Sequence, residues 1–383
     1  MNLKNELYDA WKLDEQAKRQ LLPIEQVTIA YTLLTLVLIL IFWGDMFHPG
    51  TLLLQRILIL SGIGAFYLLH RRLPSEGTRF LRNLFPLTLL GFWYPDTFEF
   101  CQLFSNKDFL FADADNALFD CQPSLEFPHM LDSKAWSELF HMGYFSYYPM
   151  IAVTIVAPLF RSRRLFEKTA FIVMASFFLY YGIYLFLPVA GPQFYFQAVG
   201  ADQVAAGHFP MLGDYFRTHT ELINTGGHEG FFRSLVEFTQ EGGERPTAAF
   251  PSSHVGISTI LMVLLYRHNR RIFYTFIPFF VLLCCSTVYI QAHYLVDVFG
   301  GFASAALFYP FTRWLYSQLH VKSYHNHSHN HRRHHRNYPP PWWKRFYISI
   351  VGMMPCMTRD SYKTTFVWPV SCILVYTLCM LWF

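Results

Sequence analysis

Apolar runs long enough to cross a bilayer recur along this chain, and they constrain its fold more than any other feature. A membrane core needs about 20 apolar residues per helix. We predict eight such spans, near Ile24–Trp43, Thr51–His70, Phe80–Tyr94, Leu139–Phe160, Thr169–Val189, Ser252–Tyr266, Ile272–Ile290 and His293–Trp314, and expect a ninth from Thr365 to the C-terminus. Backbone polar groups inside a bilayer must be paired within the protein, which a helix achieves by itself. We therefore predict an all-α integral membrane protein.

The composition agrees with a membrane protein. Only 15% of the 383 residues are charged and 53% are hydrophobic, whereas soluble domains carry roughly a quarter charged residues. The net charge of +4 is too small to indicate a nucleic-acid partner. The first twenty residues are polar, so we expect no cleavable signal peptide. Seven cysteines lack metal-ligand spacing, and a disulfide between Cys101 and Cys121 stays open.

Charge alternates between successive connections and predicts the orientation. Lys and Arg gather in every second connection, while the long loop from residue 95 to 138 is acidic. Basic loops mark the cytoplasmic side, so we expect a multi-pass protein with a cytoplasmic N-terminus. We divide the chain into an N-terminal segment with two extra helices (1–79), a six-helix catalytic membrane domain (80–316) with external loops 95–138 and 191–251, a His- and Arg-rich cytoplasmic tail (317–345) and a C-terminal membrane segment (346–383).

Three polar clusters meet at one predicted face. Arg245-Pro246 ends the second external loop, Pro251-Ser252-Ser253-His254 opens the sixth span, and His293 to Asp297 opens the eighth. The alternating direction of the spans brings all three to the periplasmic, extracellular or lumenal side. Ionisable groups at a membrane edge are costly, so they are candidates for function.

The residue types favour phosphoryl transfer through a histidine. His293 and Asp297 are four apart and share a helix face, so the carboxylate could orient the imidazole for attack. His254 could protonate a leaving oxygen. A helix start favours a bound phosphate, and Arg245 could clamp its oxygens. We expect this chemistry to require no cofactor and no metal.

Each cluster also has an ordinary structural explanation. A histidine at the end of a span is more often a structural hydrogen-bonding group, and an HxxxD pair is often a cap. Their joint occurrence on one face favours a site. A proton-gated carrier is the non-enzymatic alternative, although transporters place their sites near the middle of the bilayer.

The three clusters resemble the signature of the type 2 phosphatidic acid phosphatase superfamily, which reads KxxxxxxRP, PSGH and SRxxxxxHxxxD. Here the second part is PSSH and the third is STVYIQAHYLVD, from Ser286 to Asp297. The resemblance implies a six-helix bundle of that type. It also implies a role for each motif residue, namely His293 as nucleophile, Asp297 as its orienting partner, His254 as general acid, and Arg245, Ser253 and Pro251 as the phosphate-binding group.

Two cations of that signature are missing. The Lys position falls at Phe238 and the Arg position at Thr287. Either Arg233 or Arg217 on the same loop substitutes, or the substrate phosphate carries less charge. A phosphate monoester carries nearly two charges near neutrality, and a diester carries fewer. A diester donor therefore fits better.

A narrower resemblance also favours a phosphodiester donor. HYxxDxxGG at His293–Gly301 is similar to the inositol phosphorylceramide synthase branch, as are the stretches Asp115–Phe119 and Pro188–Pro192. This resemblance implies a transferase that moves an inositol phosphate-like head group from a phospholipid donor to a lipid alcohol acceptor such as ceramide, with Asp115 as an auxiliary residue. The alternative is a lipid phosphate phosphatase, acting on phosphatidic acid or an isoprenyl phosphate.

Overall fold

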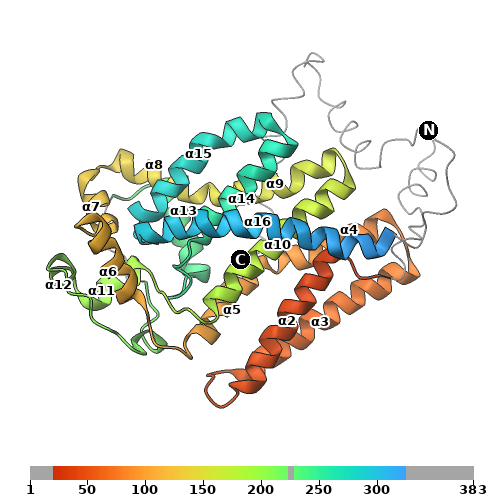
Figure 1. Cartoon of the computed structure of the whole chain (residues 1–383), viewed down its shortest axis with the longest axis horizontal. Helices are drawn as coiled ribbons and strands as arrows, with labels where there is room; N and C mark the ends of the chain where they lie inside the picture. Colours follow the sequence, from red (N-terminus) through yellow and green to blue (C-terminus); the bar gives the residue numbers. More distant parts are fainter. Residues whose placement is uncertain (1–19, 223–227, 325–383) are drawn as a thin grey trace.

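The computed structural model describes residues 20–222 and 228–324, and within these ranges every regular element is helical (Figure 1). The elements are α2 (Pro23–Ile41), α3 (Pro49–Arg72), α4 (Glu76–Thr88), α5 (Leu90–Cys101), α6 (Asp108–Phe119), α7 (Pro123–Met130), α8 (Lys134–Phe145), α9 (Tyr147–Val156), η1 (Ala157–Phe160), α10 (Arg163–Tyr184), α11 (Pro192–Val199), α12 (Ala201–Ala205), η2 (Tyr215–Arg217), α13 (Phe231–Gly243), α14 (Ser253–His268), α15 (Arg270–Tyr289) and α16 (Leu295–Tyr324). The predicted all-α membrane fold is confirmed.

Six of the eight predicted spans coincide with stretches that are long and apolar enough to cross a membrane. These are α2, α3, the continuous run from α8 to η1, α10, α15 and α16. The predicted third span is divided at Leu89 between α4 and α5, and each of these helices contains a proline that cannot donate a backbone hydrogen bond. The N-terminal segment before residue 20, the tail from residue 325 and the ninth span lie outside the described residues.

The predicted sixth span is α14, a short helix at the centre of the bundle. Its 16 residues give a length of about 24 Å. It packs against α9, α10, α15 and α16, and its buried residues surround the helix axis. A Cβ on Gly301 would lie 2.7 Å from the Ser252 carbonyl oxygen. Glycine therefore allows α16 to approach the start of α14 closely, which positions both histidine motifs.

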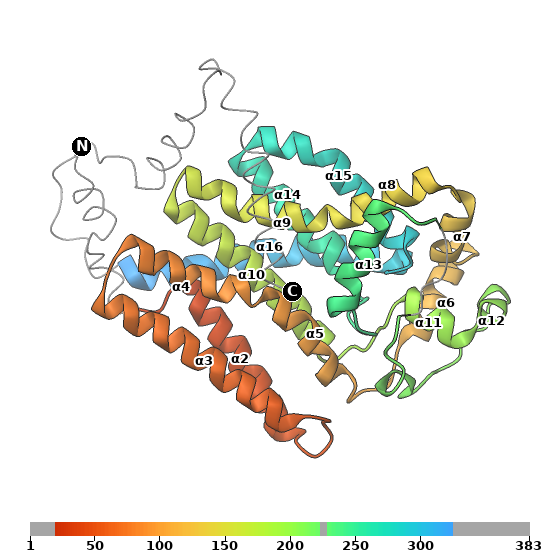
Figure 2. The same cartoon turned by 180° about the vertical axis from the view of Figure 1, so that it is seen from behind.

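The two predicted external loops contain helices of their own. The first holds α6 and α7, and the second holds α11, α12, η2 and α13. In Figures 1 and 2, α6, α7, α11 and α12 gather at one end of the molecule. Two aspartates tie this end to the start of α16. Asp115 accepts from the backbone N–H groups of Leu295 and Val296, at 2.8 and 2.9 Å.

Asp108 forms the second tie. Its buried carboxylate accepts from the backbone N–H groups of Ala190 and Gly191 and from the Tyr294 hydroxyl. Burial raises the pKa of Asp108, and the hydrogen bonds it accepts oppose that rise. Asp108 thus joins both external loops to the residue that follows His293.

The extra helices α2 and α3 form a pair that lies to one side of the other helices (Figure 2). Two buried ion pairs attach them. Arg56 on α3 makes a bidentate contact with Asp96 on α5, at 2.7 and 2.6 Å. Glu25 on α2 does the same with Arg82 on α4, at 2.7 and 2.6 Å. The thiols of Cys101 and Cys121 are free, so the disulfide that the sequence left open is not formed.

Candidate active site

The PSSH motif forms the first turn of α14. Ser252 is the N-cap residue, and its hydroxyl oxygen accepts from the Val255 backbone N–H at 3.3 Å. The Tyr184 hydroxyl donates to the Pro251 carbonyl at 2.7 Å, which fixes the segment that enters the helix. Ser253 and His254 therefore stand in the first turn, where backbone N–H groups lack helical partners.

The third motif forms the turn before α16. The His293 backbone N–H donates to the Thr287 carbonyl at 3.0 Å. Asp297 accepts from the Tyr294 backbone N–H at 2.9 Å and so caps the same helix. The Ser252 backbone N–H donates to the Asp297 carbonyl at 3.1 Å, which joins this turn to the start of α14.

The two histidines meet between these helix starts. His254 Nδ1 lies 3.3 Å from His293 Nε2. His293 Nδ1 lies 2.8 Å from the Ala249 carbonyl oxygen, which can only accept, so this nitrogen carries the proton. In neutral His293 the other nitrogen, Nε2, then has a free lone pair. Burial lowers the pKa of His293 to about 4, so the imidazole is neutral near pH 7 and its lone pair is available for attack.

Asp297 does not make the hydrogen bond that the sequence led us to expect. Its Oδ2 lies 3.5 Å from His293 Nδ1, within the range of an ion pair, but the Ala249 carbonyl holds the proton on that nitrogen. The Asp297 carboxylate can still stabilise a positive imidazole. Ala249 could not be identified from the sequence, because a backbone carbonyl gives no side-chain signal.

Two tyrosines of the predicted fourth span fix the His254 ring. The ring centroids of Tyr144 and Tyr147 lie 4.7 and 4.6 Å from that of His254. These contacts limit rotation of the imidazole. The aromatic residues of this span thus support the site directly, in addition to packing in the bundle.

A narrow cavity lies against the histidine pair. Its volume is about 10 Å³, comparable to the space that one water needs. The residues that line it come from four parts of the chain and comprise Tyr94, Tyr144, Glu244, Thr247, Ala248, Ala249, Ser253, His254, Ala292 and His293. The two imidazoles must separate for a phosphate to lie between them.

Glu244 is a functional candidate that the sequence analysis missed. Its carboxylate accepts from the Tyr94 hydroxyl at 3.0 Å and from the Gln193 side chain at 3.3 Å. Burial raises the pKa of Glu244, while the Tyr94 hydrogen bond and the nearby His293 oppose the rise. The only signal in the sequence was its position directly before Arg245.

The comparisons with known proteins can be set against this geometry. The family model of the PAP2 superfamily matches residues 110–311, which is more than half of the chain and includes all three clusters. The chain belongs to the PAP2 superfamily. No curated protein and no solved structure matches it. Membership in the PAP2 superfamily supports a lipid phosphatase or phosphotransferase type of activity in general.

The PAP2 match begins within α6 and ends within α16, so α2 to α5 lie before it. The match therefore includes His254 on α14 and His293 in the turn before α16, the two histidines that the sequence predicts to be catalytic. The narrow cavity nevertheless includes Tyr94 from α5. The N-terminal part of the chain thus contributes to the wall of the site.

The cations expected in a PAP2 phosphate site are largely engaged elsewhere. The Arg245 guanidinium donates to the Glu244 carbonyl at 2.8 Å. Arg233 pairs with Glu237 at 2.7 Å, and Arg217 donates to the Asp45 carbonyl at 3.3 Å. None of these three arginines is among the residues that line the cavity within the described part of the chain. The structure therefore does not bring the auxiliary arginines to the histidine pair.

The two positions that lack the signature cations have other surroundings. Phe238 is exposed on α13, and Thr287 is buried with its hydroxyl donating to the Cys284 carbonyl at 2.8 Å. The other auxiliary residue, Asp115, caps α16 as described above. Its carboxylate is thus engaged by protein N–H groups.

Proposed function

We propose that this PAP2 protein is a membrane phosphotransferase that moves a phospho-head group, such as inositol phosphate, from a phospholipid to a lipid alcohol such as ceramide. One observation carries the proposal. Among the described residues, the cavity beside the histidine pair is bordered by the Glu244 carboxyl and by no Lys or Arg side chain.

Charge selects the donor class. A phosphate monoester carries about two negative charges near neutrality and needs several cations to offset its desolvation. A phosphodiester carries one charge and tolerates a nearby carboxyl better. Arg245 reaches the diester by exchanging its bond to the Glu244 carbonyl for the phosphate. The backbone N–H groups of the first turn of α14, which begins at Ser253 directly after the turn at Pro251, complete the anion site.

The first half-reaction forms a phospho-histidine. The phosphate lies between the two imidazoles, where its negative charge favours the protonated form of His254. Nε2 of His293 bonds to phosphorus as the bond from phosphorus to the diacylglycerol oxygen breaks. His254 gives its proton to that leaving oxygen, and Asp297 stabilises the positive imidazole of His293.

The second half-reaction transfers the head group. The acceptor hydroxyl oxygen bonds to phosphorus, the bond from phosphorus to His293 breaks, and the acceptor proton passes to the now neutral His254. Glu244 acts as a positioning residue, because its half-buried carboxyl can bind the acceptor hydroxyl beside His293. If water attacks in place of the alcohol, the phospho-histidine is hydrolysed. Transfer therefore requires the acceptor alcohol to be bound in position before water reaches the phosphorus.

We further propose that the N-terminus is cytoplasmic and that the histidine pair opens to the opposite side of the membrane. The alternation of basic and acidic connections supports this orientation. A cysteine-accessibility measurement at the exposed position Asp113 tests it, because reaction with an impermeant thiol reagent from the cytoplasmic side contradicts the orientation.

The activity is tested by incubating the purified full-length protein with phosphatidylinositol labelled in its head group and with ceramide. We expect the label to appear in a sphingolipid product and diacylglycerol to form in equal amount. Phosphatidic acid, supplied separately, should release little inorganic phosphate.

The same experiment identifies the rival activity. Release of inorganic phosphate from phosphatidic acid, with no head-group exchange onto any lipid alcohol, contradicts the transferase and establishes a lipid phosphate phosphatase. His293→Ala should abolish either reaction, so this variant separates enzyme activity from contamination.

A further inference from the structure

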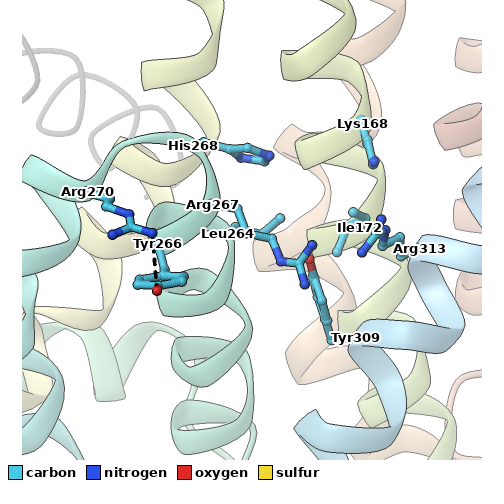
Figure 3. Close-up of a pocket in the computed structure, with 9 residues that line it drawn as sticks. All are labelled: Lys168, Ile172, Leu264, Tyr266, Arg267, His268, Arg270, Tyr309 and Arg313. Atoms are coloured by element: carbon cyan, nitrogen blue, oxygen red, sulfur yellow. Dashed lines mark hydrogen bonds between the residues drawn. The ribbon is translucent and has the colours of Figure 1, made fainter.

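A second, larger cavity lies at the opposite end of α14 from the histidine pair. Its volume is about 450 Å³. His254 and His268 are 14 residues apart on this helix, which corresponds to about 21 Å. The cavity is lined from α10, α14, α15 and α16 by Lys168, Ile172, Leu264, Tyr266, Arg267, His268, Arg270, Tyr309 and Arg313 (Figure 3). It is therefore separate from the candidate active site.

The lining is basic, and none of the described residues that form it carries a carboxylate. Lys168, Arg267 and Arg313 make no ion pair within residues 20–222 and 228–324. The neighbouring Glu167 pairs with Arg79 at 2.7 Å instead. Figure 3 shows Arg267 and Arg313 converging beside Tyr309, with Lys168 near them. Three uncompensated cations therefore surround one opening.

Two further observations describe the charge around the cavity. The Arg161 guanidinium donates to the His268 backbone carbonyl at 2.8 Å, which brings a further cation to this end of α14. Arg270 stands apart from the three cations, over the Tyr266 ring at 4.6 Å. Like charges held together without a counter-ion are unfavourable, so the arrangement favours an anion between them.

We propose that this cavity binds the head group of an anionic phospholipid that carries a phosphate monoester. Three cations match the nearly two charges of a monoester better than the single charge of a diester. Ile172, Leu264 and Tyr309 add apolar and aromatic walls beside the cations, which suit the glycerol and first methylenes of a lipid. Basic pockets between membrane helices are suited to such head groups.

A soluble phosphate compound shares the charge of the head group but not its apolar part. The lipid is favoured because the cavity lies where α10 and α15 begin and α14 ends, at the opposite end of α14 from His254. This inference does not depend on the proposed transferase, since none of its residues belongs to the histidine site.

The test uses the full-length protein in nanodiscs and measures the midpoint of thermal unfolding. The discs contain phosphatidylcholine alone, or phosphatidylcholine with phosphatidylserine or with phosphatidic acid. A ligand that binds the folded state raises the midpoint. We expect phosphatidic acid to raise it more than phosphatidylserine, and high salt to weaken the effect.

Substitutions in the cavity test whether phosphatidic acid raises the unfolding midpoint by binding there. Replacing two cations, with Lys168→Gln and Arg313→Gln together, should raise the phosphatidic acid fraction needed for a half-maximal shift at least about tenfold. Arg271→Gln is the matched control, because Arg271 is an exposed neighbour of Arg270 that does not line the cavity. It should behave as the unmodified protein.

Three outcomes overturn the inference. The first is an undiminished shift in the double variant, which would place phosphatidic acid at the histidine site. The second is an equal loss in Arg271→Gln, which would indicate only a diffuse surface charge. The third is an equal shift produced by inorganic phosphate in phosphatidylcholine discs, which would make the ligand a soluble anion.

Discussion

At the residue scale, a backbone carbonyl sets the tautomer of the His293 imidazole. The Ala249 carbonyl holds the proton on Nδ1, and the Nε2 lone pair points at His254. Each ring nitrogen of His293 therefore has a defined partner before a substrate enters. In the proposed reaction, the phosphate replaces the contact between the two histidines, with His293 as nucleophile on one side and His254 as acid on the other.

Removal of either histidine should disable the site. We expect His293→Ala to lower kcat/KM at least about a thousandfold, and His254→Ala about a hundredfold or more. The double variant should be no slower than His293→Ala, because residues of one catalytic unit fail together. His208→Ala is the control, since His208 is exposed on a distant loop. Full turnover in His293→Ala refutes the nucleophile assignment.

The pH dependence of kcat/KM should report on burial of His293. Attack requires the neutral imidazole, and burial lowers the pKa of His293 from 6.5 to about 4. The acid limb of the profile should therefore appear only as the pH falls through about 4. Measurement of kcat/KM from about pH 3 to about pH 8 checks this expectation. A limb at the ordinary histidine value would show that the nucleophile is solvated in the working enzyme.

Glu244 should matter for the acceptor more than for the donor. We expect Glu244→Ala to lower the rate of transfer to the alcohol about tenfold or more, with little change in the rate at which phospho-His293 forms. Glu244→Gln retains hydrogen-bonding capacity and should recover part of the loss. Glu241→Ala, an exposed change on α13, is the control. Equal loss in both half-reactions would assign Glu244 to structure alone.

The part of the site that the sequence predicts is the part carried by local motifs. His254, His293 and Asp297 follow from span ends and a four-residue spacing. Ala249 and Glu244 do not, because their roles depend on how a loop folds back over two helix starts. Charge counting placed Arg245 on the same predicted face as the two histidines but could not show that its guanidinium donates to the Glu244 carbonyl.

At the scale of the elements, features that depend on local sequence were again predicted, and contacts between distant segments were not. Hydropathy is a local property, so it located the spans that became long helices. It did not show that proline-containing α4 and α5 divide at Leu89, nor that the external loops fold into helices. The first of those loops contains the Asp115 cap of α16, in which the carboxylate accepts from the backbone N–H groups of Leu295 and Val296, and hydropathy does not reveal a contact between segments so far apart in the sequence.

The Asp115 cap should be needed for the position of His293. We expect Asp115→Ala to leave two backbone N–H groups without partners and to cost about 1–2 kcal/mol in the free energy of unfolding. Activity should fall as well, because His293 lies directly before the capped turn. Asp113→Ala, exposed on the same helix, is the control. Unfolding midpoints and kcat are measured for both variants. Equal values for Asp115→Ala and Asp113→Ala would contradict a role of the cap in positioning His293.

At the scale of the whole molecule, the α2–α3 pair is attached to the bundle by charge as well as by packing. Arg56–Asp96 is fully buried, whereas Arg163–Glu76 is half-exposed. Loss of one partner in a buried pair leaves an uncompensated charge. Loss of one partner in an exposed pair changes little.

We expect Asp96→Ala to destabilise the protein by about 3–5 kcal/mol and Glu76→Ala by less than about 1 kcal/mol. Unfolding of both variants in the same detergent measures the difference. Similar values for the two variants would mean that water reaches Arg56 in the folded protein.

The buried position of Arg56 also has a consequence for the order of events during synthesis. The residue lies seven positions into α3, or about 10 Å along the helix, and an arginine deep in lipid is costly. Its counter-ion is forty residues further along the chain. We therefore expect α2 and α3 to reach their final packing only after α5, which carries Asp96, has been synthesised.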